Sequence, residues 1–207
     1  SEGMRLKLTR TVTAPTQSTS LNGTTQYWSK SSPNKCTFTD DFAVGAWVYL
    51  TSYAVGSTII SRYNGTSGWE LKIGSLGVAD GRVQITGYNA SAANYSVAIS
   101  SQSVPLNKWV HIAAQLDMSA FTATTTTSYI MIDGVDVPAT VTRAGTNPTA
   151  LVQAGDLQIG AGNSTGFFPG KIAQAFYTTA KLTQANAKLI MSQGLLLADA
   201  ATYSIGS

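Results

Sequence analysis

Short segments in which apolar and polar residues alternate, separated by turn-forming residues, recur along most of this chain. Residues 4–8, 69–73 and 82–88 all show the pattern. Alternation with a period of two residues predicts strands with one buried face, and short spacing between such strands is typical of antiparallel sandwiches rather than of alternating strands and helices. The sequence therefore predicts an all-β fold in which two antiparallel sheets pack face to face.

Three pairs of residues are expected to form tight turns: Asn22-Gly23, Asp80-Gly81 and Asp133-Gly134. A two-residue hairpin turn needs positive φ angles, which glycine adopts freely and which Asn and Asp tolerate. We expect a strand at Ser20-Leu21 to enter the first turn and residues 27–30 to return from it. The other two pairs are expected to close hairpins, with Asp80-Gly81 joining the segments 69–73 and 82–88.

One long strand and one short helix are also predicted. Residues 42–50 are apolar or small on both faces, which predicts a central strand covered on both sides, with residues 59–63 as its neighbour. Thr183 is expected to cap a helix over about Gln184 to Gln193 that ends at Gly194. Residues 119–128, which include four consecutive threonines, are expected to extend two strands or to form a protruding loop.

The bulk composition narrows the class of protein. A chain of 207 residues with 43% hydrophobic residues fits one domain, residues 1–207. The net charge of +3 is small and the basic residues are scattered, so no nucleic-acid partner is expected. Cys36 is the only cysteine, which excludes an internal disulfide. No apolar run is long enough for membrane insertion, and no signal peptide is visible in this chain.

A series of short motifs occurs in a fixed order along the chain. The motifs are Phe42 to Leu50, Ile59 to Arg62, Gly68 to Leu71, Gly81 to Ile85, Leu106 to Ala113, Ile132 to Gly134, Leu157 to Gly160 and Gly170 to Ile172. Their order resembles that of the laminin-G-like, or concanavalin A-like, jelly-roll family. The resemblance covers about residues 20–193 and implies a two-sheet jelly roll with one short C-terminal helix. It also places Trp47, Trp69, Trp109 and His111 at family positions.

The resemblance also bears on calcium. Many members carry an acidic pair after the Gly-Lys-Ile motif that helps to hold a structural calcium ion, and this chain has Ala173 and Gln174 there instead. Because Ca²⁺ requires several oxygen ligands that include carboxylates, we expect this site to be lost and predict no cofactor. A different calcium site could form from two pairs of carboxylates, Asp40 with Asp41 or Asp133 with Asp136, although an Asp beside a turn more often accepts backbone hydrogen bonds.

Catalytic machinery is not evident. Retaining glycosidases of this fold carry a Glu-x-Asp-x-x-Glu strand because two nearby carboxylates must act as nucleophile and acid. Glu2 and Glu70 are the only glutamates here, and neither lies in that pattern. His111 is the only histidine and lies in an alternating segment, so we expect it to pack rather than to catalyse. The sequence therefore predicts a non-enzymatic protein, and the alternative that stays open is a glycan hydrolase or lyase that uses Asp alone.

Aromatic and amide residues near loops are the candidates for ligand binding. Sugar rings stack on Tyr and Trp, while Asn and Gln bond their hydroxyls. The tryptophans are expected mainly to fill the core, and tyrosines at strand ends could simply cover its rim. The candidate ligand-binding residues are Tyr53, Tyr63, Asn64, Tyr88, Asn89 and Tyr95.

Two functions follow from these observations. The first is a non-catalytic binding module that recognises glycans or surface proteins through loops at the sandwich edge. The alternative is a structural subunit of a surface assembly, such as a phage virion decoration or fibre protein or an extracellular filament, in which the alternating segment 4–8 could pair with another subunit. Both imply a location at an extracellular surface or on a virion.

Overall fold

The computed structural model describes residues 14–31, 33, 36–38, 41–89, 92–117, 128–145, 153, 155–179, 182–193 and 203–205. These residues form fourteen strands and one helix, which confirms the predicted all-β class. The elements are β1 (Thr19–Asn22), β2 (Trp28–Lys30), β3 (Phe42–Leu50), β4 (Ser57–Tyr63), β5 (Gly68–Ser75), β6 (Val78–Tyr88), β7 (Tyr95–Ser103), β8 (Trp109–Leu116), β9 (Tyr129–Ile132), β10 (Val135–Val137), β11 (Ala139–Ala144), β12 (Leu157–Ile159), β13 (Pro169–Thr178), α1 (Gln184–Gln193) and β14 (Tyr203–Ile205).

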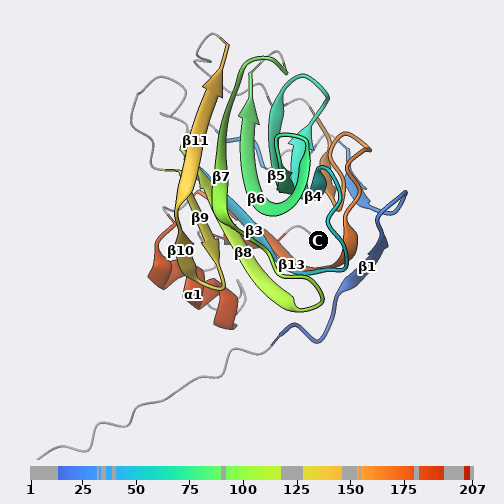
Figure 1. Ribbon diagram of the computed structural model, residues 1–207, viewed down its shortest axis with the longest axis vertical. Helices are drawn as coiled ribbons and strands as arrows, with labels where there is room; N and C mark the ends of the chain where they lie inside the picture. The colour runs from blue at the N-terminus through green and yellow to red at the C-terminus, as the bar shows by residue number, and fades with distance from the viewer. Residues whose placement is uncertain are drawn as a thin grey trace, which may run out of the picture.

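The strands form two antiparallel sheets of seven strands each (Figure 1). Sheet A has the order β1-β13-β3-β8-β9-β10, with β14 also paired to β13. Sheet B has the order β11-β7-β6-β5-β4-β12-β2. Because β1 ends sheet A and β2 ends sheet B, the short segment between them carries the chain from one sheet to the other.

The main core lies between the sheets and is built from the inward residues of both. Phe42, Trp69 and Phe168 are among its largest fully buried side chains. The ring of Phe42 stacks on Phe38 at 4.1 Å between centroids, and it contacts Trp69 at 5.5 Å. The predicted central strand is confirmed, because β3 is buried along nearly its whole length between β13 and β8.

The outer face of sheet A is covered by α1, which lies on the side of the molecule remote from β1 (Figure 1). Ala187 and Ile190 of the helix pack with Met131 and Phe176 of the sheet. The predicted helix is confirmed, and the Thr183 hydroxyl caps it by accepting a hydrogen bond of 3.1 Å from the backbone N–H of Asn186. At ten residues, this helix of the described chain is too short to cross a membrane.

Two expectations about neighbouring strands are wrong. The segment 59–63 does not pair with β3, because the loop after β3 carries the chain across to sheet B, where β4 pairs with β5 and β12. Tyr27 to Lys30 does not return beside β1 either, since β2 pairs with β12 in sheet B. Alternation shows which face of a strand is buried, but it does not identify the strand's partners.

The Asp133-Gly134 turn between β9 and β10 is confirmed, whereas Asp80-Gly81 lies within β6 and forms no turn between strands. The hairpin joining β5 to β6 turns earlier, at Leu76-Gly77, where both residues have positive φ. Gly81 serves a different purpose, because a Cβ there would lie 2.5 Å from the ring of Tyr53. Residues 4–8, most of 119–128, and Gly194 lie outside the described residues.

Candidate functional site: a cavity at the open edge of the sandwich

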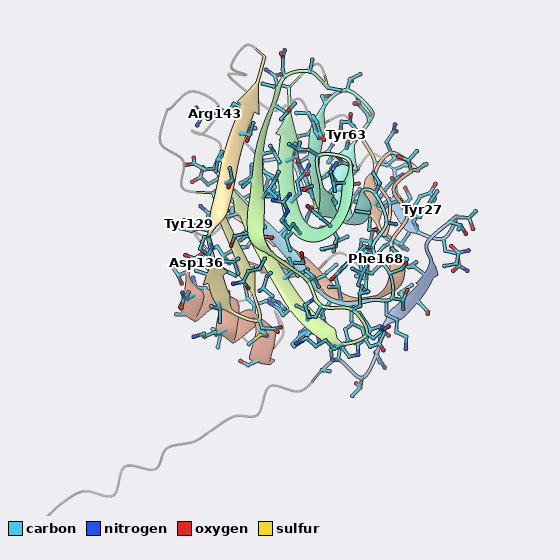
Figure 2. The ribbon with its side chains drawn as sticks, in the orientation of Figure 1. Tyr27, Tyr63, Tyr129, Asp136, Arg143 and Phe168 are labelled. Carbon is cyan, nitrogen blue, oxygen red and sulfur yellow. The ribbon has the colours of Figure 1, made fainter. Side chains whose placement is uncertain are left out.

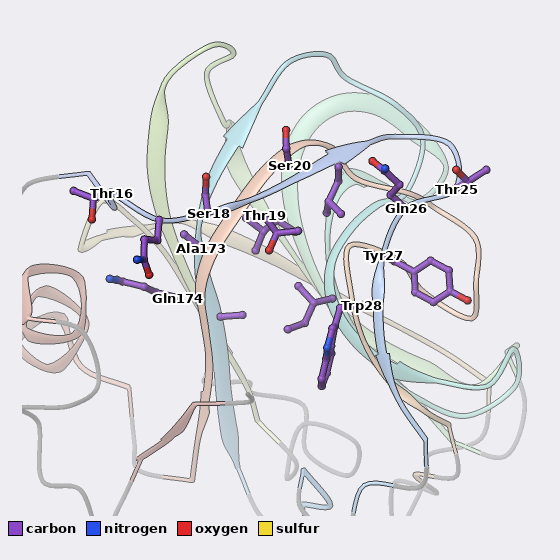
Figure 3. Close-up of a pocket in the computed structure, with 15 residues that line it drawn as sticks. Thr16, Ser18, Thr19, Ser20, Thr25, Gln26, Tyr27, Trp28, Ala173 and Gln174 are labelled. Atoms are coloured by element: carbon purple, nitrogen blue, oxygen red, sulfur yellow. The ribbon is translucent and has the colours of Figure 1, made fainter.

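A cavity of about 1030 Å³ opens at the edge where β1 and β2 end the two sheets. Its walls come from β1 and the residues before it, from the segment 25–28, and from β12 and β13 (Figure 3). The close-up shows Gln174 and Thr16 at one end, Tyr27 and Thr25 at the other, and Trp28 between them. The cavity therefore lies between the two layers rather than on the face of either sheet.

A β-bulge in β13 shapes one wall. β1 pairs with Pro169 to Ile172 and β14 pairs with Phe176 to Thr178, so among the described strands nothing pairs with residues 173–175 on that edge. On the other edge the register with β3 shifts between Ala173 and Phe176. Gln174 has a φ of 49° and is exposed. A bulge of this kind ends regular pairing and re-aims a side chain, and here it leaves a gap beside residues 16–18.

The crossing from β1 to β2 shapes the other wall. The side-chain oxygen of Asn22 accepts hydrogen bonds from the backbone N–H groups of Thr24, Thr25 and Gln26 at 3.0 to 3.1 Å. An Asn that satisfies successive backbone donors fixes a turn without a strand partner. The predicted Asn22-Gly23 turn is thus confirmed, and it sets the path of residues 26–28 across the edge.

Two aromatic side chains at this wall are exposed to solvent. Trp28 is 37% exposed and Tyr27 is 36% exposed, and both line the cavity. The hydroxyl groups of Tyr27 and Ser164 lie 3.0 Å apart, within hydrogen-bond distance. Ser164 is itself held by the side chain of Gln158, which accepts from its backbone N–H at 2.9 Å. Tyr27 is therefore oriented before any ligand arrives.

Three of the four predicted tyrosines form a separate cluster on the outward face of sheet B. The ring of Tyr88 lies 4.6 Å from that of Tyr63 and 6.2 Å from that of Tyr95, measured between centroids. The hydroxyl of Tyr63 donates to the carbonyl of Gly65 at 2.7 Å, and that of Tyr88 donates to Glu70 at 3.2 Å. Figure 2 labels Tyr63 among the strands of sheet B and Tyr27 at the edge. All three tyrosines are half-buried, and the ring of Tyr88 contacts the other two.

Electrostatics in the tyrosine cluster also favour packing. Glu70 is buried and forms an ion pair with Lys72 at 3.0 Å. Burial, followed by the nearby charge of Glu70, raises the pKa of Tyr88 far above its ordinary value, and the same two causes raise the pKa of Tyr63. Both phenols are therefore neutral. The sequence predicts only that Tyr63, Tyr88 and Tyr95 lie in or beside loops, and the structure joins them into one group.

The remaining candidates have local structural roles. The side-chain oxygen of Asn64 accepts from the N–H groups of Thr66 and Ser67 at 3.0 and 2.9 Å, which closes a turn. The Tyr53 hydroxyl donates to the carbonyl of Val104 at 2.7 Å near the other end of β6, away from Tyr88. Asn89 follows β6, and its backbone N–H donates to Asn94. The structure does not bring Tyr53 to the tyrosine cluster.

The carboxylates considered for calcium do not converge in the described part of the chain. Asp133 accepts a hydrogen bond of 2.8 Å from the N–H of His111, and Asp136 is exposed on β10. Asp41 is half-buried at the start of β3, and Asp40 lies outside the described residues. No group of three or more His, Cys, Asp or Glu that could hold a metal occurs among the residues described. Ala173 and Gln174 face the cavity, and they lack the carboxylates that Ca²⁺ requires.

His111 packs in the interior, as its sequence context predicted. Its ring stacks on Phe176 at 5.9 Å and meets Trp47 edge-on at 5.4 Å. Burial lowers the pKa of His111 to about 3, so the imidazole is neutral at physiological pH. A neutral, buried imidazole surrounded by aromatic rings cannot reach a substrate.

Trp28 is the residue that sequence reasoning missed. The tryptophans were expected to be mainly core, which holds for Trp47 and Trp69 but is wrong for Trp28. A signal was available, because the segment Gln26-Tyr27-Trp28-Ser29-Lys30 contains no aliphatic residue. Trp47, in contrast, lies among apolar residues, and Trp69 alternates with Leu71 and Ile73. A tryptophan in a polar segment just after a turn is a candidate for exposure.

Comparisons with known proteins agree with this architecture. The Ruminococcus gnavus IT-sialidase CBM40 bound to α2,3-sialyllactose superposes with a TM-score of 0.64 at 12% identity, covering 85% of this chain and 97% of that one. Domain 4 of AbnA, an extracellular arabinanase from Geobacillus stearothermophilus in complex with arabinotriose, gives 0.61 at 15% identity, covering 93% and 84%. At identities this low, the superpositions show a shared fold and nothing further.

A third structure comes from a Bacteroides ovatus protein of suspected carbohydrate binding, with a TM-score of 0.57 at 17% identity. The match covers 84% of this chain but only 47% of that protein, so the chain spans about half its length. No curated protein sequence matches the chain. A family model, in contrast, matches residues 22–187. The chain therefore belongs to the concanavalin A-like lectin/glucanase superfamily.

Proposed function

We propose that this protein is a non-catalytic carbohydrate-binding module that acts at an extracellular surface and holds its ligand in the edge cavity. The observation that carries the proposal is the pairing of two exposed aromatic rings, Tyr27 and Trp28, with a wall of hydroxyl and amide side chains in one cavity. Sugars require both features, because their C–H faces stack on aromatic rings and their hydroxyls need donors and acceptors.

The comparisons support the same class of ligand. The CBM40 structure contains sialyllactose and the AbnA domain contains arabinotriose, and both share this fold. Fold alone does not carry a ligand from one protein to another, so the argument depends on the cavity. The lack of a converging carboxylate pair among the described residues of the cavity wall agrees with binding without hydrolysis.

Surface proteins, self-assembly and a virion or filament location remain predictions. The segment predicted to pair with another subunit, residues 4–8, lies outside the described residues.

The test is a glycan array followed by calorimetric titration of the best ligand. Trp28→Ala should weaken binding by about 30-fold, since removing a stacking aromatic anchor costs about 2 kcal/mol. Tyr53→Ala is the matched control, because Tyr53 is equally exposed at 37% but lies outside the cavity. Equal losses in the two variants, or no glycan bound by the unaltered protein, would contradict the proposal.

A further inference from the structure

The cavity wall carries no charge in the described part of the chain. Every residue that lines it is a threonine, serine, glutamine, aromatic or aliphatic residue. The charged residues of the strands that border the cavity, β1, β2, β12 and β13, are Lys30 and Lys171, and neither lines the cavity. The ammonium group of Lys171 lies 5.5 Å from the ring centre of Tyr49, on the outer face of sheet A. The wall can therefore offer hydrogen bonds but no counter-ion.

A ligand with a carboxylate would lose hydration in this cavity without gaining an ionic partner, which is unfavourable. A neutral sugar loses only hydroxyl hydration, and amides and hydroxyls replace it bond for bond. The volume of about 1030 Å³ lies at the upper end of ordinary ligand pockets, so one ring would fill only part of it. Resting on the proposed function, we propose that the cavity selects uncharged oligosaccharides and that Gln174 binds them through its side-chain amide.

Gln174 is the extra residue of the bulge. Ile172 and Ala175 belong to the core between the sheets, whereas Phe176 belongs to the outer cluster under α1. Removing residue 174 would restore simple alternation, with Ile172 and Ala175 inward and Ala173 and Phe176 outward. Packing of the core therefore does not need the Gln174 side chain, which is exposed and lines the cavity.

The backbone at Gln174 is unfavourable for its residue type. A φ of 49° lies in the left-handed region, where glycine and asparagine are common and other residues are strained. Strain of this kind is typical of positions where a side chain serves a site. A glutamine here keeps a long amide, with both donor and acceptor, at the end of the cavity opposite Tyr27 (Figure 3).

The experiment for ligand class uses the full chain and matched neutral and acidic probes. Lactose is compared with α2,3-sialyllactose, and arabinotriose and other neutral oligosaccharides with oligogalacturonate, on an array and by calorimetry. Neutral probes should bind at least tenfold more tightly than their acidic counterparts. Affinity for them should stay within about twofold when salt is raised, because no ion pair is screened.

The experiment for Gln174 measures affinity and thermal stability together. Gln174→Gly should raise Tm by about 2–4 °C by relieving backbone strain, and should weaken neutral glycan binding about fivefold by removing the amide. Gln174→Asn should keep part of the affinity, since Asn carries an amide and tolerates positive φ. Leu76→Gly is the matched control: Leu76 has a φ of 45° and is exposed far from the cavity wall, so its Tm should rise with binding unchanged.

The outcomes separate this inference from the proposed function. Tighter binding of an acidic probe than of its neutral counterpart overturns the inference while glycan binding stands. Unchanged affinity in Gln174→Gly, with the Tm rise intact, shows that Gln174 does not bind the ligand. Absence of binding to every glycan overturns the proposed function and the inference with it.

Discussion

Two groups of aromatic side chains, one on the outward face of sheet B and one at the open edge of the sandwich, differ in how far the protein covers them. Tyr88 contacts both Tyr63 and Tyr95, and the hydroxyls of Tyr63 and Tyr88 are bonded within the protein. Tyr27 and Trp28 line a cavity and keep more than a third of their surface exposed. Proximity to a loop therefore does not make an aromatic residue a binding residue. What matters is whether its neighbours have already covered the ring.

The strongest test of this contrast is a variant of the tyrosine cluster that loses much of its stability and keeps its glycan affinity. Tyr88→Ala should lower the free energy of unfolding by about 3 kcal/mol, because it removes a largely packed ring. Its hydrogen bond to Glu70 is lost as well. Chemical denaturation measures this loss, and Tyr88→Phe, which keeps the ring, should lose only about 1 kcal/mol.

Glycan affinity of the folded Tyr88→Ala protein should stay within about twofold of the unaltered protein. Trp28→Ala should do the opposite, weakening glycan binding more than it lowers stability. If Tyr88→Ala abolished binding while remaining folded, the tyrosine cluster rather than the edge cavity would hold the ligand.

A somewhat smaller effect is the pH dependence of stability, which we expect from the buried interior, whereas glycan binding in the cavity should not depend on pH. Burial lowers the pKa of His111 from 6.5 to about 3 in the folded protein. Below pH 6.5 the unfolded chain therefore binds a proton that the folded chain does not, so stability falls as the pH falls from 6.5 toward 3. Between pH 7 and pH 5 the loss should be about 2 kcal/mol.

Denaturant unfolding across this pH range, compared with His111→Leu, measures that contribution. The variant should show a flatter pH dependence whatever its absolute stability. Glycan affinity should stay constant from pH 5 to 8, since no described residue of the cavity wall has an ordinary pKa in that range. An equally steep pH dependence in His111→Leu would show that other groups cause the loss.

Much of the fold could be predicted from residues 42–50, the Asp133-Gly134 turn and the Thr183 cap, because each depends on local chemistry. Strand alternation also predicted the inward and outward faces. The wrong expectations concerned partners: β4 and β2 join sheet B instead of pairing with the strands that precede them. Which sheet a strand joins depends on contacts between residues far apart in the chain, and one sequence does not contain that information directly.

The candidate site was less predictable for the same reason. Trp28 and Gln174 are 146 positions apart, and they line one cavity because β1 and β2 cross between sheets and because β13 bulges. The sequence shows that Ala173 and Gln174 replace carboxylates of the family. It does not show that they border a gap, because the gap exists only where β1 and β14 leave residues 173–175 unpaired. The packing of Tyr88 could not be predicted from the sequence either, because it depends on contacts with Tyr63, Glu70 and Tyr95 from three other strands.

The most direct measurement is an NMR titration that follows the indole N–H signals of the four tryptophans while a neutral oligosaccharide identified on the array is added. The signal of Trp28 should shift and saturate, and those of Trp47 and Trp69, which are buried, should stay in place. A static Trp28 signal, with shifts confined to backbone amides around Tyr63 and Tyr88, would contradict the edge cavity as the binding site.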